Sequence, residues 1–196
     1  VYSDNAVLQE DGEFIPYGED GGWTWREFEW KGQTLKAMHS FEPSAQSLSY
    51  IWYAPDHIRS WRKEVYENVG GHDVEYSICD DHQLMIRTYM QTKMKRIPKV
   101  LYIYRITGDN TWLERNEQIQ IKTVDLCREF GQQLAERDAE LRGLLCVDIG
   151  GGLNPYPGYH TVDIRETADA VADLNDGIPL PGNSVGVLNA SHILEH

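Results

Sequence analysis

The sequence predicts an α/β protein in which two partial sheets are joined by a helical connector. Two patterns carry this prediction. Apolar runs that begin at 144 and 159 each end in an aspartate and are separated by glycines, which is typical of adjacent strands in an α/β sheet. The polar segment 113–143 repeats apolar residues at helical spacing. We therefore divide the chain into 1–112, the connector 113–143, and 144–196.

Bulk composition limits the classes of protein that fit. With 196 residues, 41% of them hydrophobic, and a net charge of −13, the chain is an ordinary globular protein but too acidic for general nucleic-acid binding. Its 3 cysteines lack the spacing of a zinc site or a disulfide framework. No apolar run reaches ~18 residues, so we expect no transmembrane segment and a cytoplasmic location. Because the chain begins with Val1 rather than Met, we also expect residues upstream.

The first segment alternates strand and helix patterns. In chain order we expect strands at 1–7, 24–30 and 48–54, helices at 58–68 and 80–90, and a strand at 100–106. Gly70 and Gly71 end the first of these helices. The helix of the connector begins near Thr111, and Gly131 is a candidate break within it.

Two acidic features of the first segment are candidates for chemistry. The run from Tyr2 to Asn5 places Asp4 at the end of a predicted strand, where a carboxylate and phosphate oxygens could share Mg²⁺ or Mn²⁺. Asp80 and Asp81 begin a predicted helix, and a carboxylate aimed into a cleft there can deprotonate a hydroxyl group. Taken alone, such acids are more often helix caps or solvated loop residues.

The aromatic and histidine residues of this segment have ordinary alternatives. Three tryptophans near the start could form a stacking face for a sugar, although aromatic residues at strand spacing more often pack in a core; they are Trp23, Trp25 and Trp30. The spacing of His57, His72 and His82 fits no metal-ligand motif, so we expect all three to be structural.

The stretch from Trp52 to Asp73 ends in Gly-Gly-x-Asp and is followed by Asp80-Asp81-His82-Gln83-Leu84-Met85-Ile86-Arg87. These motifs resemble the middle of family 2 glycosyltransferases of the GT-A fold. The resemblance covers about 1–112 and corresponds to the acceptor half of that fold. It implies inverting transfer from a nucleotide sugar, a UDP-sugar, to a glycan acceptor.

The same resemblance implies roles for individual residues. Asp81 falls on the position of the family's catalytic base. Arg59, Arg62 and Asp80 fall on the acceptor or donor side of the site. Asp4 falls where the family has a metal-binding Asp-x-Asp motif, of which only one acid is present here, so the resemblance implies a divalent metal, Mn²⁺ or Mg²⁺, near Asp4.

The last segment pairs a glycine turn with acids at strand ends. An apolar strand ends in Asp148 and is followed by Gly150 and Gly152, and the next strand ends in Asp163. Such glycines let the backbone approach a nucleotide, and an acid in the position of Asp163 accepts the ribose hydroxyls. A tight turn without a ligand is the alternative. Because Pro155 and other turn residues separate the strands, no full crossover helix fits between them.

This segment resembles the N-terminal half of the class I S-adenosylmethionine-dependent methyltransferases, which have a Rossmann-like sheet. The resemblance rests on Asp-Ile-Gly-x-Gly-x-Asn-Pro, Val-Asp-Ile, Ala-Asp-Leu and Ser-His-x-Leu-Glu-His. It implies S-adenosylmethionine in the complete domain. The residues that it implies around this cofactor are Asp148, Gly150 and Gly152 at the methionine part, Asp163 at the ribose, Asp173 and Leu174 at the adenine, and His192 below the methyl group.

Three hypotheses follow. The first is a glycosyltransferase fused to a methyltransferase, of which this chain contains the acceptor half of one and the first half of the other. The second is a non-catalytic remnant or nucleotide-binding module. The third makes methyl transfer the main activity and the first segment a scaffold.

Overall fold

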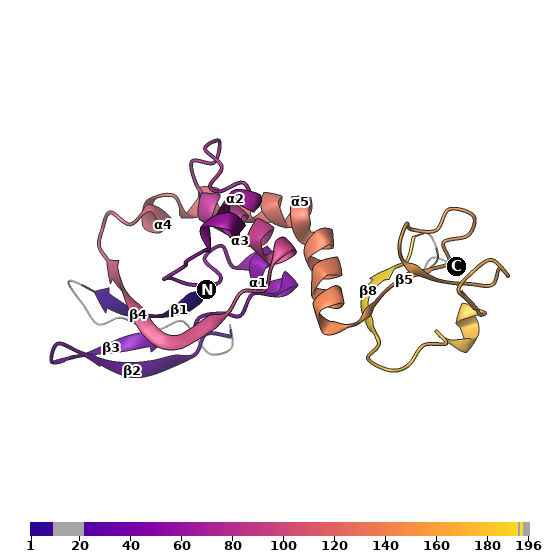
Figure 1. The fold of residues 1–196 in the computed structure, drawn as a ribbon, viewed down its shortest axis with the longest axis horizontal. Coiled ribbons are helices and arrows are strands. Elements are labelled where there is room, and N and C mark those ends of the chain that lie inside the picture. The colour runs from indigo at the N-terminus through magenta and orange to yellow at the C-terminus, as the bar shows by residue number, and fades with distance from the viewer. Residues whose placement is uncertain (10–21, 192, 194–196) are drawn as a thin grey trace. The chain divides into compact units, whose positions relative to one another are not determined.

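The computed structural model describes residues 1–9, 22–191 and 193 and shows a mixed α/β protein. The chain forms two compact units, an N-terminal unit, Val1–Leu134, and a C-terminal unit, Ala135–His196 (Figure 1). Each unit contains one four-stranded sheet. None of the helices in the described ranges is both long enough and apolar enough to cross a membrane.

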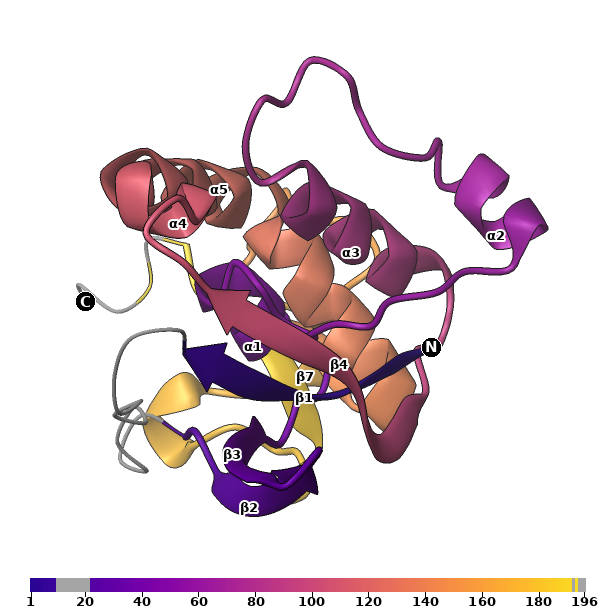
Figure 2. The ribbon, with the colours of Figure 1, turned by 90° about the vertical axis from the view of Figure 1, so that its left-hand side faces the viewer.

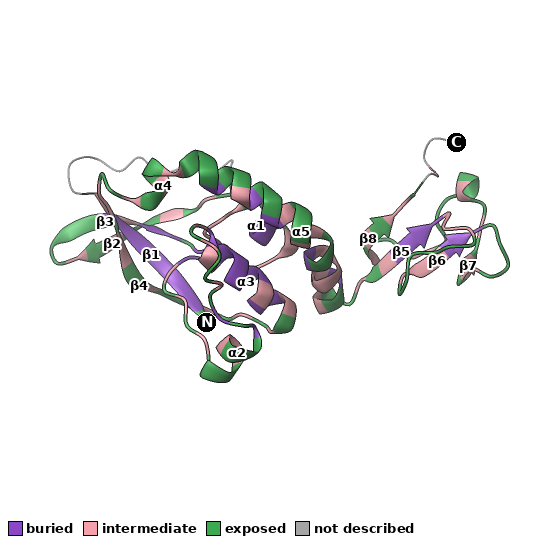
Figure 3. Ribbon diagram, turned by 90° about the horizontal axis from the view of Figure 1, so that it is seen from above, coloured by how far each residue is buried: buried purple, intermediate pink, exposed green. Residues whose placement is uncertain are grey.

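The sheet of the N-terminal unit has the order β2-β3-β1-β4. Its strands are β1 (Tyr2–Gln9), β2 (Trp25–Trp30), β3 (Gln33–Met38) and β4 (Arg96–Ile106). β1 runs antiparallel to β3 and parallel to β4. Figure 3 shows β1 buried and β2 largely exposed, as expected of an inner strand and an edge strand. Because β1 and β4 are parallel, their carboxyl ends lie at the same end of the sheet.

Helices of the N-terminal unit cover one face of this sheet (Figure 2). They are α1 (Ala45–Tyr50), α2 (Lys63–Asn68), α3 (Asp80–Gln91), α4 (Thr111–Glu114) and α5 (Asn116–Arg142), the last of which continues into the C-terminal unit. α3 supplies a large part of the core, with Leu84, Met85 and Ile86 buried. The fully buried His82 fixes α3 to α1, since its Nε2 lies 2.6 Å from the carbonyl oxygen of Leu48.

Several elements differ from the sequence predictions. The expected strand at 48–54 is wrong, because Ser44 and Ser47 form a capping box that starts α1 instead. The expected helix at 58–68 forms only from Lys63, since Arg59 is held in an extended bridge to Tyr2. Gly131 does not break the connector helix, which is interrupted at Arg115.

The C-terminal unit has a parallel sheet with the order β7-β6-β5-β8. Its strands are β5 (Leu145–Ile149), β6 (His160–Asp163), β7 (Ala170–Val171) and β8 (Val185–Asn189), and η2 (Leu174–Asp176) is a short 3-10 helix. Val147, Ile149 and Val162 form its buried core. No helix forms in the described turn 150–159, which confirms that no crossover helix fits there.

Candidate functional site

The N-terminal unit contains a cavity of ≈580 Å³ against its sheet. The lining comes from all four strands, from the segments after α1 and before α3, from the first turns of α3 and α5, and from the segment 109–112 that leads into α4. It includes Asn5, Trp25, Trp52, Tyr53, Asp56, His57, Asp80, Asp81, Tyr104, Asp109 and Trp112.

Asp81 lies in the first turn of α3 and lines this cavity. Its carboxylate forms an ion pair with Arg59 and accepts a hydrogen bond from the backbone N–H of His82 at 2.8 Å. Arg59 is buried and is itself fixed, because it donates to the carbonyl oxygens of Pro55 at 2.7 Å and Tyr53 at 2.8 Å. The Asp81 side chain, 35% exposed, is therefore accessible from the cavity and held in one orientation.

The Arg59 guanidinium decides the protonation state of Asp81. Burial by itself would raise the pKa of the Asp81 carboxyl, but the opposing charge and hydrogen bond of Arg59 outweigh it, so this pKa lies below its ordinary value. The nearest partner of Asp81 is thus a cation, although the adjacent residue, Asp80, is an acid.

The other residues implied around the base are not all brought together. Asp80 lines the same cavity, and its carboxylate lies 3.9 Å from Nε2 of His72. Arg62 does not line it. Arg62 is exposed at the start of α2 and lines a different cavity of ≈500 Å³ that also contains Trp61 and Lys93.

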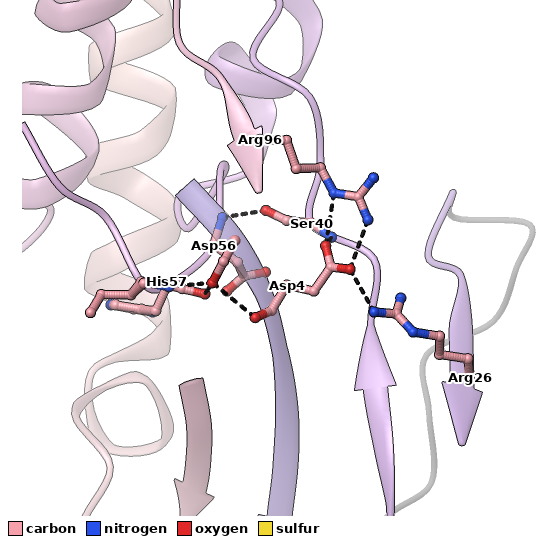
Figure 4. A network of polar contacts seen from close by, with 8 residues as sticks. Asp4, Arg26, Ser40, Asp56, His57 and Arg96 are labelled. Atoms are coloured by element: carbon pink, nitrogen blue, oxygen red, sulfur yellow. Dashed lines mark hydrogen bonds and ion pairs between the residues drawn. The ribbon is translucent and has the colours of Figure 1, made fainter. Parts of the chain in front are cut away.

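Asp4 does not end a strand and has no oxygen without a protein partner. It lies inside β1 and is fully buried. Figure 4 shows its carboxylate between Arg96, which donates at 2.8 and 2.7 Å, and Arg26, which donates at 2.7 Å. The Ser40 N–H adds a fourth bond at 3.2 Å. Burial opposes ionisation, but the arginines prevail and lower the pKa of Asp4.

These contacts correct the expected role of Asp4. Two guanidinium groups already neutralise its carboxylate, and a metal ion would have to displace them. The described residues also contain no group of three His, Cys, Asp or Glu side chains placed to hold a metal. Asp4 therefore does not fit the implied Mn²⁺ or Mg²⁺ site, and we assign no chemical step to a metal.

Aromatic side chains form much of the cavity wall. Of the three tryptophans considered from sequence, only Trp25 lines the cavity. Trp30 packs against the sheet core, and Trp23 packs edge-on against Phe41 at 5.6 Å. The sequence analysis missed four other rings of the wall, which are Trp52, Tyr53, Tyr104 and Trp112.

Three polar residues of the lining were also missed as a group: Asn5, Asp56 and His57. Burial raises the pKa of Asp56 to about 7, although Arg59 opposes this shift. Burial also lowers the pKa of His57 to about 4, so its ring is neutral at pH 7. A signal in the sequence was the acid-histidine pair between Pro55 and Arg59, but only folding buries it.

Arg87, the last residue of the motif 80–87, stabilises the turn that follows α2. Its guanidinium donates to the carbonyl oxygens of Val69 and Gly71, and its Nε donates to Gln83 at 2.8 Å. Gly70 and Gly71 both have positive φ, so glycine suits this turn. The motif thus joins the start of α3, with Asp81, to the chain that follows α2.

In the C-terminal unit, Asp148 fixes the glycine turn after β5. Its buried carboxylate accepts hydrogen bonds from the N–H of Tyr156 at 2.8 Å and the amide of Asn189 at 2.6 Å. A Cβ on Gly151 would lie 2.2 Å from this carboxylate, so Gly151 is required by packing. Gly150 has φ 66° and packs against Ile193.

Asp163 lies at the carboxyl end of β6 and faces the same turn. It accepts hydrogen bonds from the N–H groups of Gly152 and Arg165, each at 3.0 Å. Gly152 has φ 61°, and a Cβ there would meet only Arg165, at 4.0 Å, so the backbone is open at this point. The structure therefore brings together the glycine turn and the acid that the sequence analysis paired.

The remaining predicted cofactor residues lie in the same unit. Asp173 caps η2 by accepting from the N–H of Asn175 at 2.9 Å. Leu174 packs against the sheet core. His192 lies outside the described residues.

Comparison of the chain with family models, with curated proteins and with solved structures finds no match. The function is therefore argued from the two sites themselves.

Proposed function

We propose that the N-terminal unit supplies the acceptor half of an enzyme that transfers a glycosyl group from a nucleotide sugar to a hydroxyl group of a glycan acceptor. The observation that carries this proposal is the Asp81 carboxylate, which Arg59 holds beside a cavity with aromatic walls. Aromatic rings offer broad apolar faces on which a sugar ring can pack. The cavity volume of ≈580 Å³ also lies within the usual range for small-molecule sites.

Asp81 would act as the base in a single displacement. Its lowered pKa keeps it ionised at neutral pH, so it can accept a proton. The acceptor oxygen attacks the anomeric carbon while its proton passes to Asp81. The bond between that carbon and the diphosphate oxygen breaks, and the diphosphate leaves with the electron pair. One displacement inverts the configuration of the carbon.

Replacement of the base tests this proposal. General-base catalysis contributes about 10²–10⁴-fold in rate, so Asp81→Asn should lower transfer by at least about 100-fold and leave nucleotide-sugar affinity nearly unchanged. Asp80→Asn, a neighbouring acid of the same helix turn, should cause a smaller loss. The assay measures diphosphate release and product mass, with a panel of nucleotide sugars and glycosides, for a protein that also contains the donor half.

Two outcomes would contradict the proposal. If Asp81→Asn kept most of the wild-type rate, Asp81 would not be the base. If the wild-type protein with both halves transferred no sugar from any donor of the panel, a non-catalytic nucleotide-binding module or a scaffold for methyl transfer would be the better account.

For the C-terminal unit, we propose that it supplies part of an S-adenosylmethionine site in the complete domain. The supporting observation is the bond from Gly152 to Asp163, which joins an open glycine turn to an acid at the end of the adjacent parallel strand. Asp163 would accept the ribose hydroxyls, and the backbone near Gly150 and Gly152 would approach the methionine part. When bound, the cofactor would supply an activated methyl group.

A further inference from the structure

Three residues that line the Asp81 cavity carry buried polar atoms without hydrogen-bond partners. Within the described residues these atoms are Oδ1 of Asn5, Oδ2 of Asp56 and Nδ1 of His57. All three residues line the cavity. Asn5 is 5% exposed and Asp56 is 6% exposed. Buried polar groups normally have partners, so three exceptions in one cavity need an explanation.

The backbone around Asp56 and His57 is held by hydrogen bonds. The Asp56 N–H donates to Ser40 Oγ at 2.7 Å (Figure 4). Ser3 Oγ donates to the carbonyl oxygen of His57 at 3.2 Å and accepts from the N–H of Ile58 at 3.0 Å. His57 also stacks on Tyr102, with ring centroids 5.1 Å apart. The open polar atoms are therefore held in place by a satisfied framework, as expected of a preorganised binding site.

The charges of the cavity indicate the chemical class of the ligand. Its described lining contains four aspartates, Asp56, Asp80, Asp81 and Asp109, and neither lysine nor arginine. Such a lining offers no cation to a phosphate group, so the diphosphate of a nucleotide sugar would lie outside the cavity and only the sugar within it. Carboxylate and amide oxygens instead accept hydrogen bonds from hydroxyl groups, and the neutral His57 ring can accept or donate one.

We propose that Asn5, Asp56 and His57 form a subsite that binds the hydroxyl groups of a neutral sugar ring. The inference rests on the proposed function, since it names the part of the substrate that these three residues bind. The ring would hydrogen-bond to the three open atoms, with the aromatic wall of Trp25, Trp52 and Tyr104 in the same cavity. The sugar could belong to the acceptor or to the nucleotide sugar, and the experiment separates these sources.

The experiment measures binding to the full chain by calorimetry and saturation-transfer NMR. Methyl glycosides of common hexoses represent the acceptor, and UDP-glucose compared with UDP isolates the donor sugar. The variants are Asp56→Leu and Asn5→Leu, which remove the hydrogen bonds, and Asp56→Asn, which keeps the shape if a leucine variant fails to fold. Asp125→Asn, an exposed acid on α5, is the control.

We expect the leucine variants to lose at least 10-fold in affinity. Loss for a methyl glycoside identifies the acceptor sugar, and loss of the advantage of UDP-glucose over UDP identifies the donor sugar. The melting temperature of the leucine variants should stay the same or rise, because each substitution removes an unpartnered buried polar group. Asp56→Asn should also weaken binding, and Asp125→Asn should not.

The inference is overturned if the wild-type chain binds no methyl glycoside and binds UDP-glucose no better than UDP. It is also overturned if the variants bind as wild type does, which would mean that water satisfies these atoms. The outcome is separable from the proposed function. If sugar binding depends on Asp56 but no transfer occurs, the subsite stands and the proposed reaction fails. If transfer depends on Asp81 but not on Asp56, the proposed reaction stands and the subsite fails.

Discussion

At the scale of single residues, the site contains two aspartates, Asp81 and Asp56, whose surroundings shift their pKa values in opposite directions. Asp81 contacts Arg59 directly, and its pKa lies below the ordinary value. Asp56 is almost fully buried, its Oδ2 has no hydrogen-bond partner, and burial raises its pKa to about 7. Neighbouring acids with opposite shifts can take different roles at one pH. Asp81 is ionised and suited to accept a proton, whereas Asp56 changes its charge near neutrality.

The raised pKa of Asp56 makes stability depend on pH. In the unfolded chain Asp56 ionises near its usual pKa of about 3.9, but in the folded chain it keeps its proton to about pH 7. The folded state binds more protons between these values, so stability falls as pH rises through this window. The stability lost by about pH 8 is on the order of 4 kcal/mol. Asp56→Asn, which cannot ionise, should therefore gain on wild type as pH rises from 5 to 8.

Tryptophan fluorescence measures this effect in the right unit. The chain has 6 tryptophans, and all of them precede Leu134, so the signal reports the unfolding of the N-terminal unit alone. Comparison with wild type at each pH cancels the contributions of Asp4 and Asp81, whose lowered pKa values act at more acidic pH. A difference in melting temperature that did not change between pH 5 and pH 8 would show that Asp56 is ionised throughout.

At the scale of elements, the Asp4 carboxylate on β1 connects this strand to β2, to β4 and to the residues just after β3. It lies on β1, and its partners are Arg26 on β2, Arg96 on β4 and the Ser40 N–H just after β3. A carboxylate with this many charge-assisted bonds organises strand packing. Sequence alone pointed to a metal ligand because it showed one acid and none of the partners, which are between 22 and 92 residues away.

The strand-turn-strand element of β5 and β6 carries a prediction of its own. Asp163 ties the turn by accepting from Gly152 and Arg165, and a hydrogen bond to a charged group contributes about 1.5–3 kcal/mol. Asp163→Ala should therefore raise the exchange rates of these two amides by about 10–150-fold. The measurement is hydrogen exchange followed by NMR, with amides of β4 as an internal reference in the N-terminal unit.

A second arm of the same measurement tests the proposed cofactor. In a protein that contains the complete domain, S-adenosylhomocysteine should slow the exchange of the Gly152 and Arg165 amides, and it should have no effect when that protein carries Asp163→Ala. Identical rates with and without the ligand in the complete domain would count against an S-adenosylmethionine site at this turn.

Sequence patterns predicted the elements that local chemistry determines. The helix from Asp80, with its acids in the first turn, and the strands that end at Ile149 and Asp163 form close to where periodicity placed them. α1 was missed because a capping box of two serines outweighed a β-rich composition. Asp81, which lines the cavity, was proposed from its motif, whereas Asp56 was not, because its burial arises only in the folded chain, where its N–H bonds to Ser40.

At the scale of the whole molecule, the two units pose separable questions. All tryptophans belong to the N-terminal unit, and the glycine turn with Asp163 belongs to the C-terminal unit. Ligands of one unit can therefore be followed without interference from the other. This separation also distinguishes a chain with two binding sites from one in which only a single unit is functional.

The most direct test of the central claim is a ¹H–¹⁵N spectrum of the indole groups during titration with a nucleotide sugar and a methyl glycoside. Trp25, Trp52 and Trp112 line the Asp81 cavity, whereas Trp30 packs in the sheet core and Trp61 lines the second cavity. If the Asp81 cavity is the sugar site, the indole signals of the first three should shift, and those of Trp30 and Trp61 should not. Shifts confined to Trp61, or no indole shift with any sugar, would contradict it.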